Sequence, residues 1–147
     1  MSETLSDLFE GRVEPGIYRL TSRAGTGAIG DEAARHGWRF VPLDGRQIAT
    51  KADFLQACAA VLDFPVYSGR NWDALQDNLR DLAWAPAEAG YLVLYDHAGE
   101  FATANPADFA VALDILRSTV ASWRGTATPM TVLLRGAGRA ASAVPKL

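Results

Sequence analysis

The chain has 147 residues, a formal net charge of −3 and 49% hydrophobic residues. This length suits one domain with a sizeable core. The negative charge argues against direct binding of nucleic acid, which needs a basic surface, and is compatible with a basic protein partner. No apolar run approaches the roughly 18 residues of a membrane span, and the acidic residues 1–7 lack a signal-peptide pattern. We therefore expect neither a nucleic-acid nor a membrane partner.

Cys58 is the single cysteine, and it lies within an apolar helical pattern. Because it cannot form an internal disulfide, we expect a reducing compartment, a cytoplasmic location and a buried thiol. The two histidines, His36 and His97, are far apart in the chain and give no metal-ligand spacing. We therefore expect no metal site. We also expect no cofactor and a monomeric chain.

The N-terminal part begins with a polar lead-in, residues 1–14, in which a short helix is expected. Residues 16–21 alternate and are rich in strand-forming side chains, which predicts a strand. Residues 23–30 are small and glycine-rich, which indicates a flexible loop. Residues 31–36 leave room for at most about two helical turns before Gly37.

The next part predicts a strand followed by a helix. Residues 38–43 alternate again, and Pro42 marks either an edge position or a bend of the strand. Thr50 is a good helix N-cap, and Asp53 stands where the acid of a capping box would be. An apolar stripe at helical spacing then continues to Leu62.

The stretch from residue 64 to residue 82 predicts a loop that leads into a helix. Pro65 and Gly69 punctuate the loop, and Asn71 is a good N-cap. Side chains at helical spacing then define an apolar face, Leu75, Leu79 and Leu82, and a carboxylate face, Asp73, Asp77 and Asp81.

The C-terminal part predicts a strand, a helix and a strand. Residues 91–95 form a continuous apolar run, as in a strand buried on both faces of a parallel sheet. Residues 105–123 form a helix that begins with Asn-Pro, and residues 129–135 form the last strand. Residues 136–147 are rich in alanine and glycine and are expected to be a disordered tail. Strands that alternate with helices predict an α/β domain with a largely parallel sheet.

Two motifs admit an enzymatic reading. Residues 25–30 match G-x-G-x-x-G, and Asp44 follows at about the distance of a ribose-binding acid, but residues 22–24 separate the first glycine from the preceding strand. Asp96 and His97 follow a buried strand, where an acid–base pair could lie; the alternative is a loop aspartate next to a solvated histidine. A small nucleotide-binding enzyme is therefore one alternative, although we expect no catalytic residue.

The carboxylate face also admits two readings. A solvated helix surface would explain it, and Asp73 near the helix start would be favourable there. Like charges at i, i+4 repel by about 0.2–0.5 kcal/mol per pair, a cost expected of a surface that binds a cation-rich partner. Tyr67 and Trp72 lie near the helix start and are residue types that anchor interfaces.

A family resemblance bears on this choice. Residues 64–77 read FPVYSGRNWDALQD. They resemble the signature of the barstar family, intracellular protein inhibitors of barnase-type ribonucleases. The resemblance extends over residues 38–135, whose strands and helices follow in the family's order. It implies a small parallel sheet of three core strands packed with helices, to which residues 17–21 would add an N-terminal edge strand within an extension, residues 1–37.

The resemblance also implies a site and a partner. Residues 67–81 would plug the active site of a secreted-type basic ribonuclease and mimic RNA phosphates. Asp77 would be the central anchor for the cations that hold the scissile phosphate, and Asp73 would lie at the rim. The complete set of expected partner-binding residues is Tyr67, Gly69, Asn71, Trp72, Asp73, Gln76 and Asp77.

The chain departs from the family at several positions. Ser68 and Gln76 stand where the best-known member has large aromatic residues, and Arg70 replaces an acid. A further family acid falls near Ser118. An interaction or regulatory module with a non-nuclease partner is therefore an alternative function.

Overall fold

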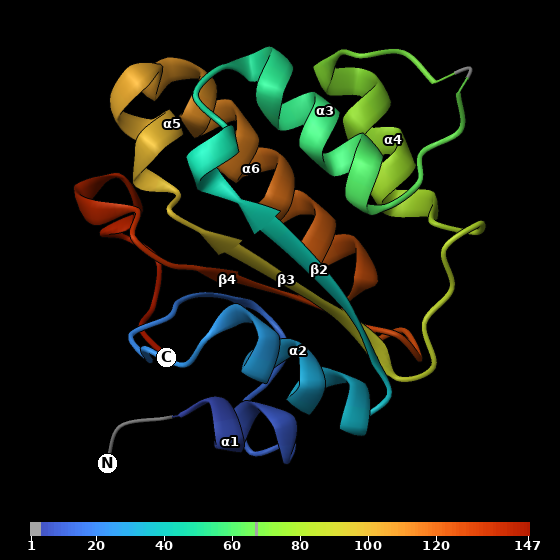
Figure 1. Cartoon of the computed structure of the whole chain (residues 1–147). Coiled ribbons are helices and arrows are strands. Elements are labelled where there is room, and N and C mark those ends of the chain that lie inside the picture. Colours follow the sequence, from blue (N-terminus) through green and yellow to red (C-terminus); the bar gives the residue numbers. More distant parts are fainter. Residues whose placement is uncertain (1–3, 67) are drawn as a thin grey trace.

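Within the described residues, 4–66 and 68–147, four parallel strands form one sheet in the order β1-β4-β3-β2 (Figure 1). In this computed structural model β3 is central, and Val93 pairs with Val41 of β2 and with Val132 of β4. The predicted α/β class with a parallel sheet is confirmed. The strands are β1 (Ile17–Arg19), β2 (Trp38–Asp44), β3 (Gly90–Asp96) and β4 (Met130–Leu134).

Every predicted strand is present, with its ends shifted by at most two residues. β3 is buried from Gly90 through Tyr95, as its continuous apolar run predicts. β2 lies at one edge of the sheet, where Pro42, which has no backbone N–H, is tolerated. β1 lies at the other edge.

Helices cover both faces of the sheet (Figure 1). One face carries α3 (Lys51–Val61), α4 (Trp72–Asp81), α5 (Gly99–Ala104) and α6 (Pro106–Trp123). The other face carries α1 (Leu5–Phe9) and α2 (Thr26–Arg35). The sequence pattern predicted all of these except α5. Thr50 and Asp53 form the expected capping box at the start of α3.

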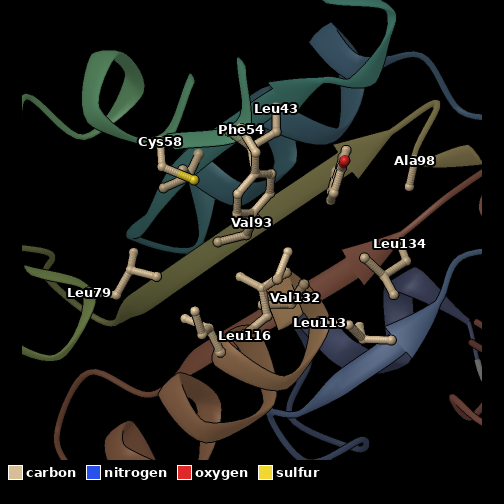
Figure 2. Close-up of a cluster of buried hydrophobic side chains, with 14 of the residues drawn as sticks. Leu43, Phe54, Cys58, Leu79, Val93, Ala98, Leu113, Leu116, Val132 and Leu134 are labelled. Atoms are coloured by element: carbon tan, nitrogen blue, oxygen red, sulfur yellow. The ribbon is translucent and has the colours of Figure 1, made fainter. Parts of the chain in front are cut away.

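Alternation along the strands divides the apolar side chains between two cores. Val93 and Val132 face the larger core, where Figure 2 shows them clustered with Leu79 of α4 and Leu116 of α6. The smaller core joins strand leucines to the N-terminal helices; it includes Leu8, Ile29, Ala33, Leu92, Leu94 and Leu133. Residues 4–37 therefore supply most of the cover on one face of the sheet.

Helix α2 corrects the expectation of a flexible loop at residues 23–30. The helix begins at Thr26, so residues 26–30 are helical, and it is longer than the two turns predicted. A Cβ atom added at Gly30 would lie 2.8 Å from Cδ2 of Phe40 on β2. The small residues that suggested a loop thus allow this helix to approach the sheet closely.

Residues 136–147 also differ from the expected disordered tail. They contain a short 3-10 helix, Gly138–Ala141, and the side chains of Val144 and Leu147 are buried. The backbone N–H of Leu147 donates to the carbonyl of Arg19 at 2.8 Å, beside β1. Burial of these two apolar side chains stabilises a segment whose composition suggested disorder.

Candidate protein-binding site

The loop before α4 ends in the predicted cap. Oδ1 of Asn71 accepts a hydrogen bond from the backbone N–H of Ala74 at 2.8 Å. A Cβ atom added at Gly69 would lie 2.9 Å from Nδ2 of Asn71. Glycine at position 69 therefore leaves room for the capping side chain, and the two residues together shape the start of α4.

Helix α4 is anchored through its apolar face. Leu75 and Leu79 are buried, as predicted. Leu82 is buried too, but it is the C-cap residue and has a left-handed backbone with φ of 50°. The indole N–H of Trp123 in α6 donates to the carbonyl of Leu79 at 2.8 Å. This contact satisfies a carbonyl in the last turn of α4, so both ends of the helix are fixed.

The carboxylate face of α4 points to solvent. Asp73, Asp77 and Asp81 are exposed and lie one helical turn apart along one side of the helix. Within residues 4–66 and 68–147, none of the three takes part in an ion pair or a side-chain hydrogen bond. The carboxylates are thus available to donors on another molecule.

The neighbouring arginines bind neutral acceptors instead of these aspartates. Nη2 of Arg80 donates to Oγ of Ser118 in α6 at 3.1 Å. Nη1 of Arg70 donates to the carbonyl of Ser68 at 3.3 Å. Both arginines are exposed, so the surface combines a row of free carboxylates with cations at its borders.

Trp72 contributes to both the core and the surface. Its ring is half-buried, with its centroid 6.3 Å from that of Phe54, and Nζ of Lys51 lies 5.2 Å from the ring centroid. Gln76 is half-buried in the middle of α4. Tyr67, the remaining predicted contact residue, lies outside the described residues.

Val66 is a feature that the sequence interpretation missed. Its side chain is 98% exposed, which is unusual for a large apolar residue. It lies in the loop between Pro65 and Ser68, beside the predicted contact residues. The available signal was an apolar residue in a loop, and this signal is weak because many such residues fold inward.

The candidate acid–base pair has another role. Nε and Nη2 of Arg135 donate to the Asp96 carboxylate at 3.1 and 2.8 Å, and the backbone N–H of His97 donates to it at 2.9 Å. The contact with histidine is thus to its backbone, not to its ring. The hydrogen bonds from Arg135 lower the pKa of Asp96, which makes this carboxylate a poor general base.

The G-x-G-x-x-G match does not form a phosphate loop after a strand. β1 ends at Arg19, well before Gly25, and the second and third glycines lie inside α2.

Burial raises the pKa of the Cys58 thiol to about 12, as fits a core residue. Within the described residues, no group of three His, Cys, Asp or Glu side chains could hold a metal ion. No helix in the same part of the chain is long and apolar enough to cross a membrane.

The fold and the site define a class: an α/β protein that presents a loop and an acidic helix face to solvent. The family model described as Barstar (barnase inhibitor) matches residues 38–135, more than half of the chain. The chain belongs to the barstar family, and the resemblance read from residues 64–77 is confirmed. The matched range includes the loop, α4 and the three strands β2, β3 and β4.

Two solved structures resemble the fold over most of this chain. The chain is similar to the ORC2 protein of Aeropyrum pernix in its ADPNP-ADP complexes, with 16% identity and a TM-score of 0.55 over 94% of this chain and 39% of that one. It is similar to a chain of Drosophila ORC bound to AT-rich DNA and Cdc6, with 15% identity and a TM-score of 0.52 over 89% of this chain and 42% of that one. The chain spans about two fifths of these structures, and the likeness shows the fold alone. No curated protein matches the chain.

Proposed function

We propose that the chain is a protein inhibitor of a barnase-type ribonuclease and blocks the active site of that enzyme with residues 67–81. The observation that carries the proposal is the free state of Asp73 and Asp77 on a capped and anchored helix, in a chain of the barstar family. Inhibition by occlusion needs no catalytic residue, metal or cofactor in the inhibitor. The chain is thus not an enzyme in this proposal.

The chemistry is the replacement of phosphate oxygens by carboxylate oxygens. A ribonuclease holds the scissile phosphate with arginine, lysine or histidine side chains, and these donors form strong charge-assisted hydrogen bonds with carboxylates. Asp77 is the central acceptor in the proposal, and Asp73 binds at the rim. Because neither aspartate forms an ion pair with any described residue, no such contact has to break first.

The other predicted residues position or surround this pair. Asn71 and Gly69 fix the start of α4, which limits the entropy that binding must remove. Trp72, Gln76 and Tyr67 are proposed to contact the nuclease around the aspartates; tryptophan and tyrosine are enriched at interface centres.

The partner in this proposal is a secreted-type basic ribonuclease, and the inhibitor is a cytoplasmic monomer that binds no nucleic acid directly. Complementary charge speeds the encounter of two proteins, and dissolved salt screens it. Association should therefore slow as the ionic strength rises.

A second candidate is an interaction module with a partner that is not a nuclease. Arg70 and Arg80, which border the aspartates, favour this alternative because they suit a partner with carboxylates of its own. The two candidates share the surface and differ in the chemistry of the partner.

The proposal is tested by capture followed by an activity assay. The tagged chain and its Asp77→Asn variant are used as baits on cells and culture medium from the same source. We expect only the unmodified bait to retain a basic ribonuclease, and added chain to abolish cleavage of a fluorogenic RNA at one-to-one stoichiometry. A captured partner without ribonuclease activity, or a nuclease that stays active in excess inhibitor, would contradict the proposal.

A further inference from the structure

A cavity of about 390 Å³ lies at the carboxyl ends of β2, β3 and β4, and none of the described residues of the loop or of α4 lines it. Three parts of the chain form its wall. They are residues 23–26 at the start of α2; Pro42, Leu43, Asp44 and Arg46 at the end of β2 and just after it; and Leu94, Asp96, His97 and Arg135 at the ends of β3 and β4. Figure 1 shows the arrowheads of β2 and β3 at the same end of the sheet. Ligands of open parallel sheets bind at this edge.

Most of the charges around the cavity are neutralised by one another. Nε and Nη2 of Arg46 each lie 3.0 Å from the Asp44 carboxylate, and Arg135 binds the Asp96 carboxylate in the same two-pronged way. Nη1 of Arg135 also donates to the carbonyl of Ala24 at 2.7 Å. These contacts fix the wall, and among the described residues the Nη1 group of Arg46 has no hydrogen-bond partner.

Arg23 is the cavity arginine whose positive charge is not paired with a described carboxylate. It is exposed at the cavity wall, and within the part of the chain that the structure describes it has no ion pair or side-chain hydrogen bond. The ring of His97 likewise has no hydrogen-bond partner among those residues. The cavity therefore combines one uncompensated positive charge with a ring that can donate or accept a hydrogen bond.

His97 is held at the cavity by close backbone packing. Its backbone is left-handed, with φ of 50°. A Cβ atom added at Gly45 would lie only 2.2 Å from the carbonyl oxygen of His97, so the turn after β2 packs directly against this residue. The backbone of His97 is thus fixed by its packing against the turn that follows β2.

We propose that this cavity binds a small phosphorylated molecule. Its phosphate binds Arg23 and the free nitrogen of Arg46, since guanidinium groups match phosphate oxygens in geometry and charge. Its organic part lies against Pro42 and Leu94, which line the same cavity. The volume is at the lower end of the roughly 300–1,000 Å³ range of ligand pockets, which suits a ligand the size of a sugar phosphate.

This site is independent of the proposed inhibitory face. Residues 23–26 precede the family-matched range, 38–135, so the N-terminal extension supplies part of the cavity wall. Binding at the cavity and binding at α4 can therefore each be present without the other.

The test is a titration of the ¹⁵N-labelled full chain with inorganic phosphate and with ribose 5-phosphate at constant ionic strength, followed by amide chemical shifts. We expect saturable shifts at residues 23–26, Arg46 and His97, and tighter binding of ribose 5-phosphate than of inorganic phosphate. The Arg23→Gln variant should bind at least about tenfold more weakly, because a charge-assisted hydrogen bond is lost.

Arg124→Gln is the matched control, since Arg124 is an exposed arginine beyond the end of α6. It should bind like the unmodified chain, and amide spectra show whether each variant is folded. No saturable shift, or an equal loss in both variants, would overturn the site. Equal affinity for the two probes would overturn the role given to Pro42 and Leu94.

Discussion

Arg80 donates a hydrogen bond to Ser118 at 3.1 Å and not to Asp77, which lies three residues before it on α4. The hydroxyl group belongs to α6, so a contact between two helices directs the arginine. A residue at i+3 is well placed to pair with an aspartate on a helix surface. The hydroxyl of Ser118 thereby helps to leave the Asp77 carboxylate free.

Removal of that hydroxyl should slow partner binding. In Ser118→Ala, Arg80 can turn toward Asp77, and a surface ion pair of this kind contributes about 0.3–0.5 kcal/mol. We expect association with the captured nuclease to slow about twofold at low salt, measured by stopped-flow fluorescence. Ser122→Ala is the control, because among the described residues the Ser122 hydroxyl bonds only to the carbonyl of Thr119 in its own helix. Equal rates for the two variants would contradict this role of Ser118.

The Asn71 cap predicts a stability change. Asn71→Ala removes the acceptor for the Ala74 backbone N–H. We expect the free energy of unfolding to fall by about 1 kcal/mol, measured by urea denaturation. Asn78→Ala, in the interior of the same helix, is the comparison and should be neutral or slightly stabilising because alanine is the better helix former. Equal free energies of unfolding for the two variants would show that the Asn71 cap does not stabilise the chain.

Two buried tyrosines predict opposite effects. Within the described residues the hydroxyl of Tyr95 is buried with no hydrogen-bond partner, whereas the hydroxyl of Tyr91 donates to the carbonyl of Ala85 at 2.8 Å. Tyr95→Phe should raise the free energy of unfolding by about 1 kcal/mol, and Tyr91→Phe should lower it by about 1 kcal/mol. Thermal and urea unfolding of the pair measure both changes. A destabilised Tyr95→Phe would mean that this hydroxyl has a partner.

The Asp96–Arg135 pair predicts a dependence on pH. Arg135 lowers the pKa of Asp96 in the folded chain, while the unfolded chain keeps an ordinary value of about 3.9. The stabilisation is therefore complete above the ordinary pKa and is lost as the pH falls through the lowered one. Asp96→Asn should lower the free energy of unfolding by about 2 kcal/mol at neutral pH.

Measurements at acidic pH test whether the Asp96–Arg135 ion pair is the source of this stabilisation. The stability difference between the unmodified chain and Asp96→Asn should shrink as the pH falls below about 4. Urea denaturation at a series of pH values measures it. Asp31→Asn, on an exposed part of α2, is the control for loss of a charge alone. A difference that stayed constant down to low pH would exclude the ion pair as its source.

Local signals account for what the sequence could predict. The alternation of β2, the apolar run of β3 and the caps at Thr50 and Asn71 depend on residues close together in the chain. The positions of the aspartates follow from helical spacing alone, because residues four apart share one side of a helix.

Tertiary contacts account for what the sequence could not predict. Gly30 leaves room for α2 to lie close to Phe40, and Leu147 is buried where its backbone bonds to Arg19 from the other end of the chain. The contact between Arg80 and Ser118 joins two helices across a long sequence separation. No pattern within a single element contains such pairings.

The most direct test of the account is the affinity of the captured ribonuclease for Asp77→Asn, measured by calorimetry beside Asp31→Asn. Both variants remove one exposed helical carboxylate, and the two helices lie on opposite faces of the sheet (Figure 1). We expect Asp77→Asn to weaken binding by at least about tenfold with unchanged stability, and Asp31→Asn to bind like the unmodified chain. Full affinity in Asp77→Asn would contradict the proposed inhibitory surface.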